Sequence, residues 1–85
     1  MYEIVFTPQA RKLFLQLQKE IQIRILKKLE RVRIRPEHFL LPLSNIGGFK
    51  LRVGSYRLII DLEKDRLILL IIKVGHRKNI YKGLN

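Results

Sequence analysis

The stretch GFKLRVGSYRLII, residues 48–60, decides the fold because its pattern predicts a β-hairpin. Gly54-Ser55 lies between two alternating runs, and the first central position of a two-residue type II′ turn requires a positive φ, which glycine adopts readily. A turn at this point determines the register of both strands. It pairs Val53 with Tyr56, Arg52 with Arg57, Leu51 with Leu58, and Lys50 with Ile59.

This hairpin gathers like charges on one face. Because side chains alternate between faces along a strand, Lys50, Arg52 and Arg57 share a face, and we call these three residues the platform. The leucines between them face the core. Directly opposed like charges destabilise a sheet by roughly 0.2–1 kcal/mol per pair. A bound anion would account for them, although both arginines could instead extend into water and be screened.

The whole chain is short and basic. Its 85 residues predict a single domain over 1–85. Eighteen Lys and Arg against seven Asp and Glu leave a net charge of +11, which makes a polyanion the leading class of partner. With no cysteine and only two histidines, the chain has no metal-ligand pattern, so we expect neither a metal nor a cofactor.

No segment has the features of a secretory signal or a membrane span. The start, MYEIVFTPQ, lacks a basic stretch followed by an apolar one. The longest apolar run, Leu67 to Ile72, is far below the ~18 residues that would cross a bilayer. We therefore expect a soluble, cytoplasmic protein with no membrane partner.

Residues before the hairpin predict a strand and two helices. Residues 2–7 alternate as a short strand, and Thr7-Pro8 supplies an N-cap and a first helical residue. Helical periodicity continues to Arg35-Pro36. One helix of this length would be about 40 Å long at 1.5 Å per residue, and a domain of this size is barely that wide. A helical hairpin that bends near Gln18 to Glu20 is therefore the favoured interpretation.

Residues 36–46 are expected to be a connector, 62–66 a charged turn and 66–74 a strand that is apolar on both faces. The amino-terminal strand is placed beside this last one, which gives the order second, third, fourth, first, with its direction left open. The predicted fold class is α+β: an amino-terminal strand, a helical hairpin and a three-stranded antiparallel meander form a four-stranded sheet with the helices on one face.

The carboxyl-terminal segment VGHRKNIY carries further polar groups just after the last strand. Gly75 is expected to allow a sharp exit from the sheet, after which His76, Arg77 and Tyr81 could fold over the platform. The combination of FKLR (49–52), YRLI (56–59) and GHRKNIY (75–81), in this order, resembles the RelE/ParE toxin superfamily. It is most similar to the RelE branch, the messenger-RNA interferases of type II toxin–antitoxin pairs.

The resemblance covers essentially the whole chain and implies an activity. Such a toxin would be a ribosome-dependent endoribonuclease that cleaves messenger RNA through attack of a 2′-hydroxyl on the adjacent phosphate, and would inhibit translation. Its implied partners are a RelB-like antitoxin, with which it would form a hetero-oligomer, the ribosome and messenger RNA. An acidic or amphipathic antitoxin segment would cover the platform or displace the tail.

The resemblance also assigns residues. The implied catalytic residues are Lys50, Arg52, Arg57, Arg77 and Tyr81. The residues that we expect to bind RNA are Lys50, Arg52, Arg57, His76, Arg77, Lys78 and Lys82. The chain departs from the family pattern in two ways. Arg52 stands where the best-studied branch has lysine, and arginine stays protonated in proteins, so it is a poor base. The sequence ends four residues after Tyr81, so we expect no longer terminal helix.

Several alternatives remain open from the residues themselves. Lys50 and His76 are both candidate bases, the latter because imidazole changes its charge near neutral pH. Tyr81 could stack on a base or merely anchor the tail, His76 could cap a strand end, and Arg77 could bind phosphate without catalysis. The basic residues of the helices are interpreted mainly as a solvated face.

Two other functions compete with the nuclease. A ParE-like toxin shares the fold but poisons DNA gyrase by binding, and the joint presence of Lys50, Arg57, Arg77 and Tyr81 argues against it. A small RNA-binding module without catalysis would need only the charge.

Overall fold

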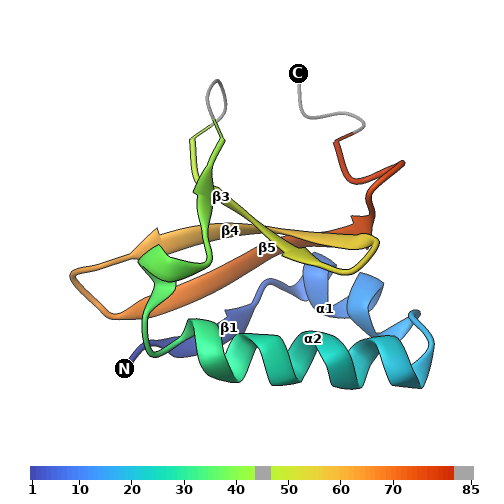
Figure 1. The fold of residues 1–85 in the computed structure, drawn as a ribbon, viewed down its shortest axis with the longest axis horizontal. Coiled ribbons are helices and arrows are strands. Elements are labelled where there is room, and N and C mark those ends of the chain that lie inside the picture. The colour runs from blue at the N-terminus through green and yellow to red at the C-terminus, as the bar shows by residue number, and fades with distance from the viewer. Residues whose placement is uncertain (44–46, 82–85) are drawn as a thin grey trace.

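The structure is a computed structural model and describes residues 1–43 and 47–81. It consists of a five-stranded sheet with two α-helices packed on one side (Figure 1). In chain order, the elements are β1 (Glu3–Phe6), α1 (Pro8–Leu15), α2 (Lys19–Val32), a 3₁₀-helix (Pro36–His38), β2 (Leu41–Pro42), β3 (Phe49–Val53), β4 (Tyr56–Glu63) and β5 (Ile68–His76).

The helical region is a hairpin of two helices, as the sequence predicted. Thr7 caps α1, because its Oγ1 accepts a hydrogen bond from the Ala10 N–H at 3.1 Å. The helical conformation is interrupted at residues 16–18, and α2 begins at Lys19. The Gln22 side chain fastens the break, since its Nε2 donates to the carbonyl oxygen of Leu17 at 2.9 Å. The bend therefore lies slightly before the predicted range of Gln18 to Glu20 and overlaps it only at Gln18.

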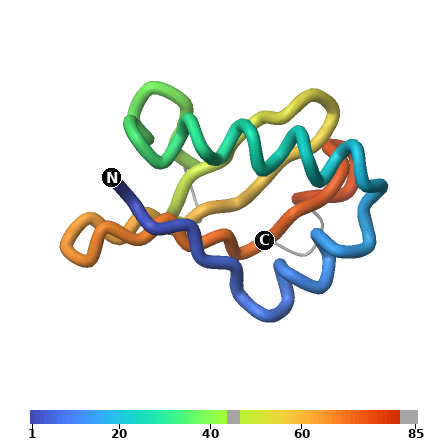
Figure 2. Tube along the Cα trace, turned by 90° about the horizontal axis from the view of Figure 1, so that it is seen from below, coloured from blue at the N-terminus to red at the C-terminus, as the bar shows by residue number. Residues whose placement is uncertain are grey.

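The sheet has the order β1-β5-β4-β3-β2, which confirms the predicted order of the four strands that the sequence indicated. The hairpin register is also confirmed, with Arg52 opposite Arg57 and Lys50 opposite Ile59. The direction of β1, left open by the sequence, is parallel to β5. Figure 2, seen from the helix side, shows α1 at the β5 side of the sheet and α2 at the β3 side.

Two details of the predicted sheet are wrong. The connector over residues 36–46 contributes a fifth strand, β2, whose Leu41 pairs with Lys50. The prediction missed this strand because two residues, one of them proline, show no alternating pattern. Residues 44–46 of the connector lie outside the described residues. The turn after β4 is also shorter than predicted. Leu62 still belongs to β4, and β5 begins only at Ile68 because Leu67 adopts a φ of 55°.

The core lies between the helices and the face of the sheet opposite the platform. Leu51, Leu58 and Ile60 of the sheet are at most 1% exposed, and they belong to one cluster with Ile25 and Leu29 of α2. The helices thus cover one face and leave the platform on the other. Among the described residues, no helix combines the length and the apolar character that crossing a bilayer needs.

Candidate functional site on the open face of the sheet

The platform lines one pocket. Lys50, Arg52 and Arg57 surround a cavity of about 220 Å³ together with Phe39 and Leu41. Leu41 and Lys50 are partners across β2 and β3, as are Arg52 and Arg57 across β3 and β4, so neighbouring strands supply its wall. Lys50 and Arg57 are half-buried and Arg52 is exposed. The structure therefore brings together the cations that the sequence had placed on one face.

Arg57 is held in position by the turn next to it. Its Nη1 donates to the carbonyl oxygens of Gly54 and Tyr56, each at 2.8 Å. Gly54 has a φ of 59°, whereas Ser55 is not among the described residues with positive φ, which fits the predicted type II′ turn rather than type I′. Since two carbonyls orient one end of the guanidinium, its Nε and Nη2 groups can donate to an anion.

The carboxyl-terminal tail, residues 77–81, follows β5 and leaves the sheet beside the hairpin turn. Figure 1 shows it rising from the end of β5 on the side away from the helices. Gly75 is the partner of Arg57, so a Cβ on Gly75 would point to the platform face, where it would lie 3.4 Å from Cδ1 of Ile80. Ile80 is only 1% exposed. It is therefore packed on Gly75, next to Arg57.

This packing corrects the role predicted for Gly75. The residue does not let the chain leave the sheet, because β5 continues through it to His76. Its missing side chain instead makes room for Ile80. The chain leaves the sheet at Arg77, whose N–H donates to the carbonyl oxygen of Ser55 at 2.8 Å and so ties the tail to the hairpin turn.

The remaining residues of the predicted catalytic set lie on this tail. Arg77 and Tyr81 are exposed, Tyr81 by 40%, and neither lines the platform pocket. Lys78 is exposed as well, and Lys82 lies outside the described residues. The tail thus lies beside the platform, while its two key side chains do not form part of the pocket wall. Their action on a shared phosphate remains a prediction.

His76 lies on the opposite face from Arg57. It is the partner of Tyr56, and the two rings meet edge to face with centroids 5.5 Å apart. Its Nδ1 accepts the N–H of Lys78 at 3.2 Å, so the imidazole caps the beginning of the tail. This geometry matches the structural interpretation of His76, and its proposed contact with RNA remains a prediction. In the described ranges, no group of three or more His, Cys, Asp or Glu could hold a metal ion.

A known protein family matches nearly the whole chain. Residues 4–81 match the family model described as ParE toxin of type II toxin-antitoxin system, parDE. The match includes both helices, all five strands except the first residue of β1, and the platform. The chain belongs to the RelE/ParE superfamily of type II toxins.

Individual relatives of this RelE/ParE toxin carry the RelE name. A RelE-like toxin protein of Escherichia coli is 29% identical over 83 residues, which cover 91% of this chain and 84% of the relative. A chain of the toxin–antitoxin complex RelBE2 of Mycobacterium tuberculosis has 26% identity and a TM-score of 0.82, with 89% of this chain and 98% of that chain covered. A chain of the intact RelBE toxin–antitoxin complex of E. coli has 25% identity and a TM-score of 0.78, with 89% of this chain and 96% of that chain covered.

Two parts of the open face in this RelE/ParE toxin escaped the sequence reasoning. Phe39 and Leu41 enter the platform pocket from the connector, and only their apolar character could have indicated it. Lys73 pairs with Ile59 across β5 and β4, which puts its Cβ on the platform face. A single charge within an otherwise apolar strand was the available signal.

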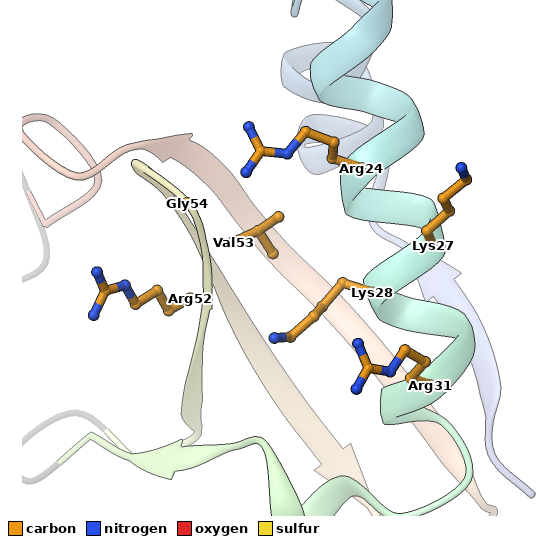
Figure 3. A pocket seen from close by; sticks show the side chains of 7 residues that line it. All are labelled: Arg24, Lys27, Lys28, Arg31, Arg52, Val53 and Gly54. Carbon is orange, nitrogen blue, oxygen red and sulfur yellow. The ribbon is translucent and has the colours of Figure 1, made fainter.

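A second cationic surface of the toxin lies between α2 and the edge of the sheet, and we call it the α2 groove. It has a volume of about 270 Å³, and its lining residues are Arg24, Lys27, Lys28, Arg31, Arg52, Val53 and Gly54. Figure 3 shows Arg24, Lys28 and Arg31 extending from α2 toward β3. The sequence reasoning treated these helix residues as a solvated face, because it could not tell which of them face the sheet.

Proposed function

We propose that this toxin is a ribosome-dependent endoribonuclease that cleaves messenger RNA and inhibits translation. The observation that carries the proposal is the pocket of Lys50, Arg52 and Arg57, whose strand β4 pairs with the strand that leads into the tail with Arg77 and Tyr81. A phosphodiester bound there would have positive charge on one side, and we infer that the tail brings the Tyr81 phenol to it. Membership in the superfamily and the RelE-like relatives support the same activity.

The proposed chemistry divides among these residues. Attack of a 2′-hydroxyl on the adjacent phosphate requires loss of the hydroxyl proton, stabilisation of charge on the phosphate and protonation of the leaving oxygen. Arg57 suits the second task best, because its guanidinium is already oriented by the two carbonyls and needs no rearrangement. Arg52 adds charge, Lys50 is the candidate base, and Arg77 and Tyr81 complete the site from the tail.

We also propose a RelB-like antitoxin as the neutralising partner. The solved relatives in Mycobacterium tuberculosis and Escherichia coli are toxin–antitoxin complexes. A net charge of +11 favours an acidic partner segment, which would cover the platform or displace the tail. The resulting complex would be a hetero-oligomer in the cytoplasm.

One observation favours a second candidate function. The family model that matches residues 4–81 carries the ParE name, and ParE-like toxins poison DNA gyrase. A gyrase poison would act by binding alone and would have no use for an arginine that is oriented by two carbonyls. The nuclease is therefore the preferred function.

A translation reaction with added toxin tests the proposal. Primer extension on the messenger RNA is expected to show new 5′ ends within codons, and only when ribosomes are present. The Arg57→Ala variant serves as the matched inactive protein. Inhibition of gyrase supercoiling without RNA cleavage would establish the ParE-like function instead, and a shift of RNA without cleavage would establish a binding module.

A further inference from the structure

The α2 groove is a strongly cationic surface of which the proposed reaction uses only Arg52. Its charged lining residues are Arg24, Lys27, Lys28, Arg31 and Arg52, and no carboxylate belongs to the lining. In the part of the chain that the structure describes, the ion pairs are Arg33 with Glu30 and Arg66 with Glu63. Within the described residues, the charges of the groove therefore have no carboxylate partner, which indicates an anionic ligand from outside.

The spacing of these cations suits a linear ligand. Arg24, Lys27, Lys28 and Arg31 follow one another at intervals of three and four residues, which places them along one side of α2. From Arg24 to Arg31 the helix advances about 10 Å at 1.5 Å per residue. A stacked nucleic-acid strand advances about 3.4 Å per nucleotide, so this distance corresponds to about three phosphates.

The groove and the platform pocket are connected through shared residues. Arg52 lines both cavities, and Figure 3 shows its guanidinium on the side of β3 away from α2. Phe39 forms the second connection. Its ring lines the platform pocket and lies 5.3 Å from the Lys28 ammonium and 5.6 Å from the Arg31 guanidinium. A continuous cationic surface with one aromatic ring therefore runs from the open face of the sheet to α2.

We propose that the α2 groove binds the sugar–phosphate backbone of the RNA strand that flanks the phosphodiester on the platform. This inference rests on the proposed function for the nature of the strand. Sites for single-stranded nucleic acid combine a cationic groove that follows the backbone with aromatic side chains, and this surface has both. An acidic protein segment would match the charge but has no bases to stack on the Phe39 ring.

Equilibrium binding of RNA that cannot be cleaved tests the inference. The probe is a fluorescent, fully 2′-O-methylated single strand of about 12 nucleotides, within the usual length of such sites, and a second probe has about four nucleotides. The groove variant Arg24→Gln/Lys27→Gln/Lys28→Gln is compared with Arg11→Gln/Lys12→Gln/Lys19→Gln. The second variant loses the same types and number of charges from exposed positions outside the groove.

The groove variant is expected to bind the longer probe about 10–100-fold more weakly at low salt. Its plot of log K against log salt should have a slope smaller by about 2, because each lost phosphate contact on a single strand contributes about 0.7. The control variant should change this slope by less than the value of one phosphate contact, about 0.7. Both variants should bind the short probe as tightly as the parent. Equal losses in the two variants would overturn the inference, since general charge would then explain binding.

Two further results also decide the matter. In the unmodified toxin, photo-crosslinking of a 4-thiouridine strand is expected to label residues 24–31 as well as the platform, and labelling confined to the platform would contradict the groove. A groove variant that binds RNA like the parent but loses binding to polyglutamate would assign the groove to an acidic protein segment. None of these assays measures cleavage, so a toxin that binds in this way without cutting messenger RNA would refute only the proposed function.

Discussion

The platform and the α2 groove are both cationic, but they hold their charges in different ways. On the platform, Arg52 and Arg57 face each other across two paired strands, and the turn carbonyls orient Arg57. In the groove, long side chains extend from successive turns of a helix, and none of them donates to the backbone in the described residues. Fixed charge suits chemistry at one phosphate, whereas adjustable charge suits a grip on a strand.

Loss of Arg57 is expected to have the largest effect and to separate the two surfaces. Arg57→Ala should lower the single-turnover rate of ribosome-dependent cleavage about 10²–10³-fold, the usual cost of removing one oriented donor to a developing charge. Primer extension over time measures the rate, with Lys64→Ala in the exposed β4–β5 turn as the control. An equal loss in Arg24→Ala, which changes only the groove, would contradict the division of roles.

The Tyr81 hydroxyl is expected to have the next largest effect. Tyr81→Phe should reduce cleavage about 10²-fold, within the range for a positioned proton donor, and should leave binding of uncleavable RNA unchanged. Stacking would survive this substitution, so Tyr81→Ala separates the ring from the hydroxyl. Cleavage by Tyr81→Phe at the parent rate would show that the phenol is only an anchor.

Ile80 is expected to determine whether the tail stays beside the platform. Ile80→Ala should reduce the free energy of unfolding by about 2 kcal/mol, because the side chain is 1% exposed against Gly75. Cleavage should fall as well, since the tail carries Arg77 and Tyr81. Urea denaturation measures the stability, and Ile72→Ala, at a position that is 42% exposed, should cost much less. Equal costs would mean that the tail does not pack on the sheet.

Gly54 lies where the two surfaces meet, and its replacement should have a moderate effect. Gly54→Ala forces a positive φ on alanine, which costs about 1–2 kcal/mol, and its new Cβ would lie 2.9 Å from Nη2 of Arg24. Gly47 has a similar φ of 76°, but a Cβ there would have no atom within 4 Å. Comparing the thermal unfolding of Gly54→Ala and Gly47→Ala therefore separates the cost of the collision with Arg24 from the cost of the positive φ. In an Arg24→Ala background the two costs should converge.

The smallest effect is expected at Phe39, which connects the surfaces. Phe39→Leu should lower the free energy of unfolding by about 0.5–1 kcal/mol, because an apolar side chain remains but the cation–π contacts are lost. Chemical denaturation in a Lys28→Gln/Arg31→Gln background provides the control. The loss should shrink there, and an unchanged loss would attribute it to packing alone.

Local signals predicted the parts of the fold that depend on neighbours in the chain. The Thr7-Pro8 start of α1 and the hairpin register follow from a few adjacent residues, whereas the break between the helices was predicted from the length that a single helix would have. The fifth strand escaped prediction because β2 exists only through its pairing with β3. Lys73 was passed over because it joins the platform face only through the pairing of β5 with β4, where it lies opposite Ile59.

By itself, the sequence determined that Lys50, Arg52 and Arg57 share a face, because a two-residue turn and a side-chain period of two allow one pairing. Only the tertiary structure decided that Ile80 packs on Gly75 and that the basic side of α2 faces the edge of β3. The contact between α2 and β3 joins segments far apart in the chain, and its geometry depends on how the helices pack against the sheet. The contact between Ile80 and Gly75 depends on how the chain turns back after β5. No local periodicity encodes either arrangement.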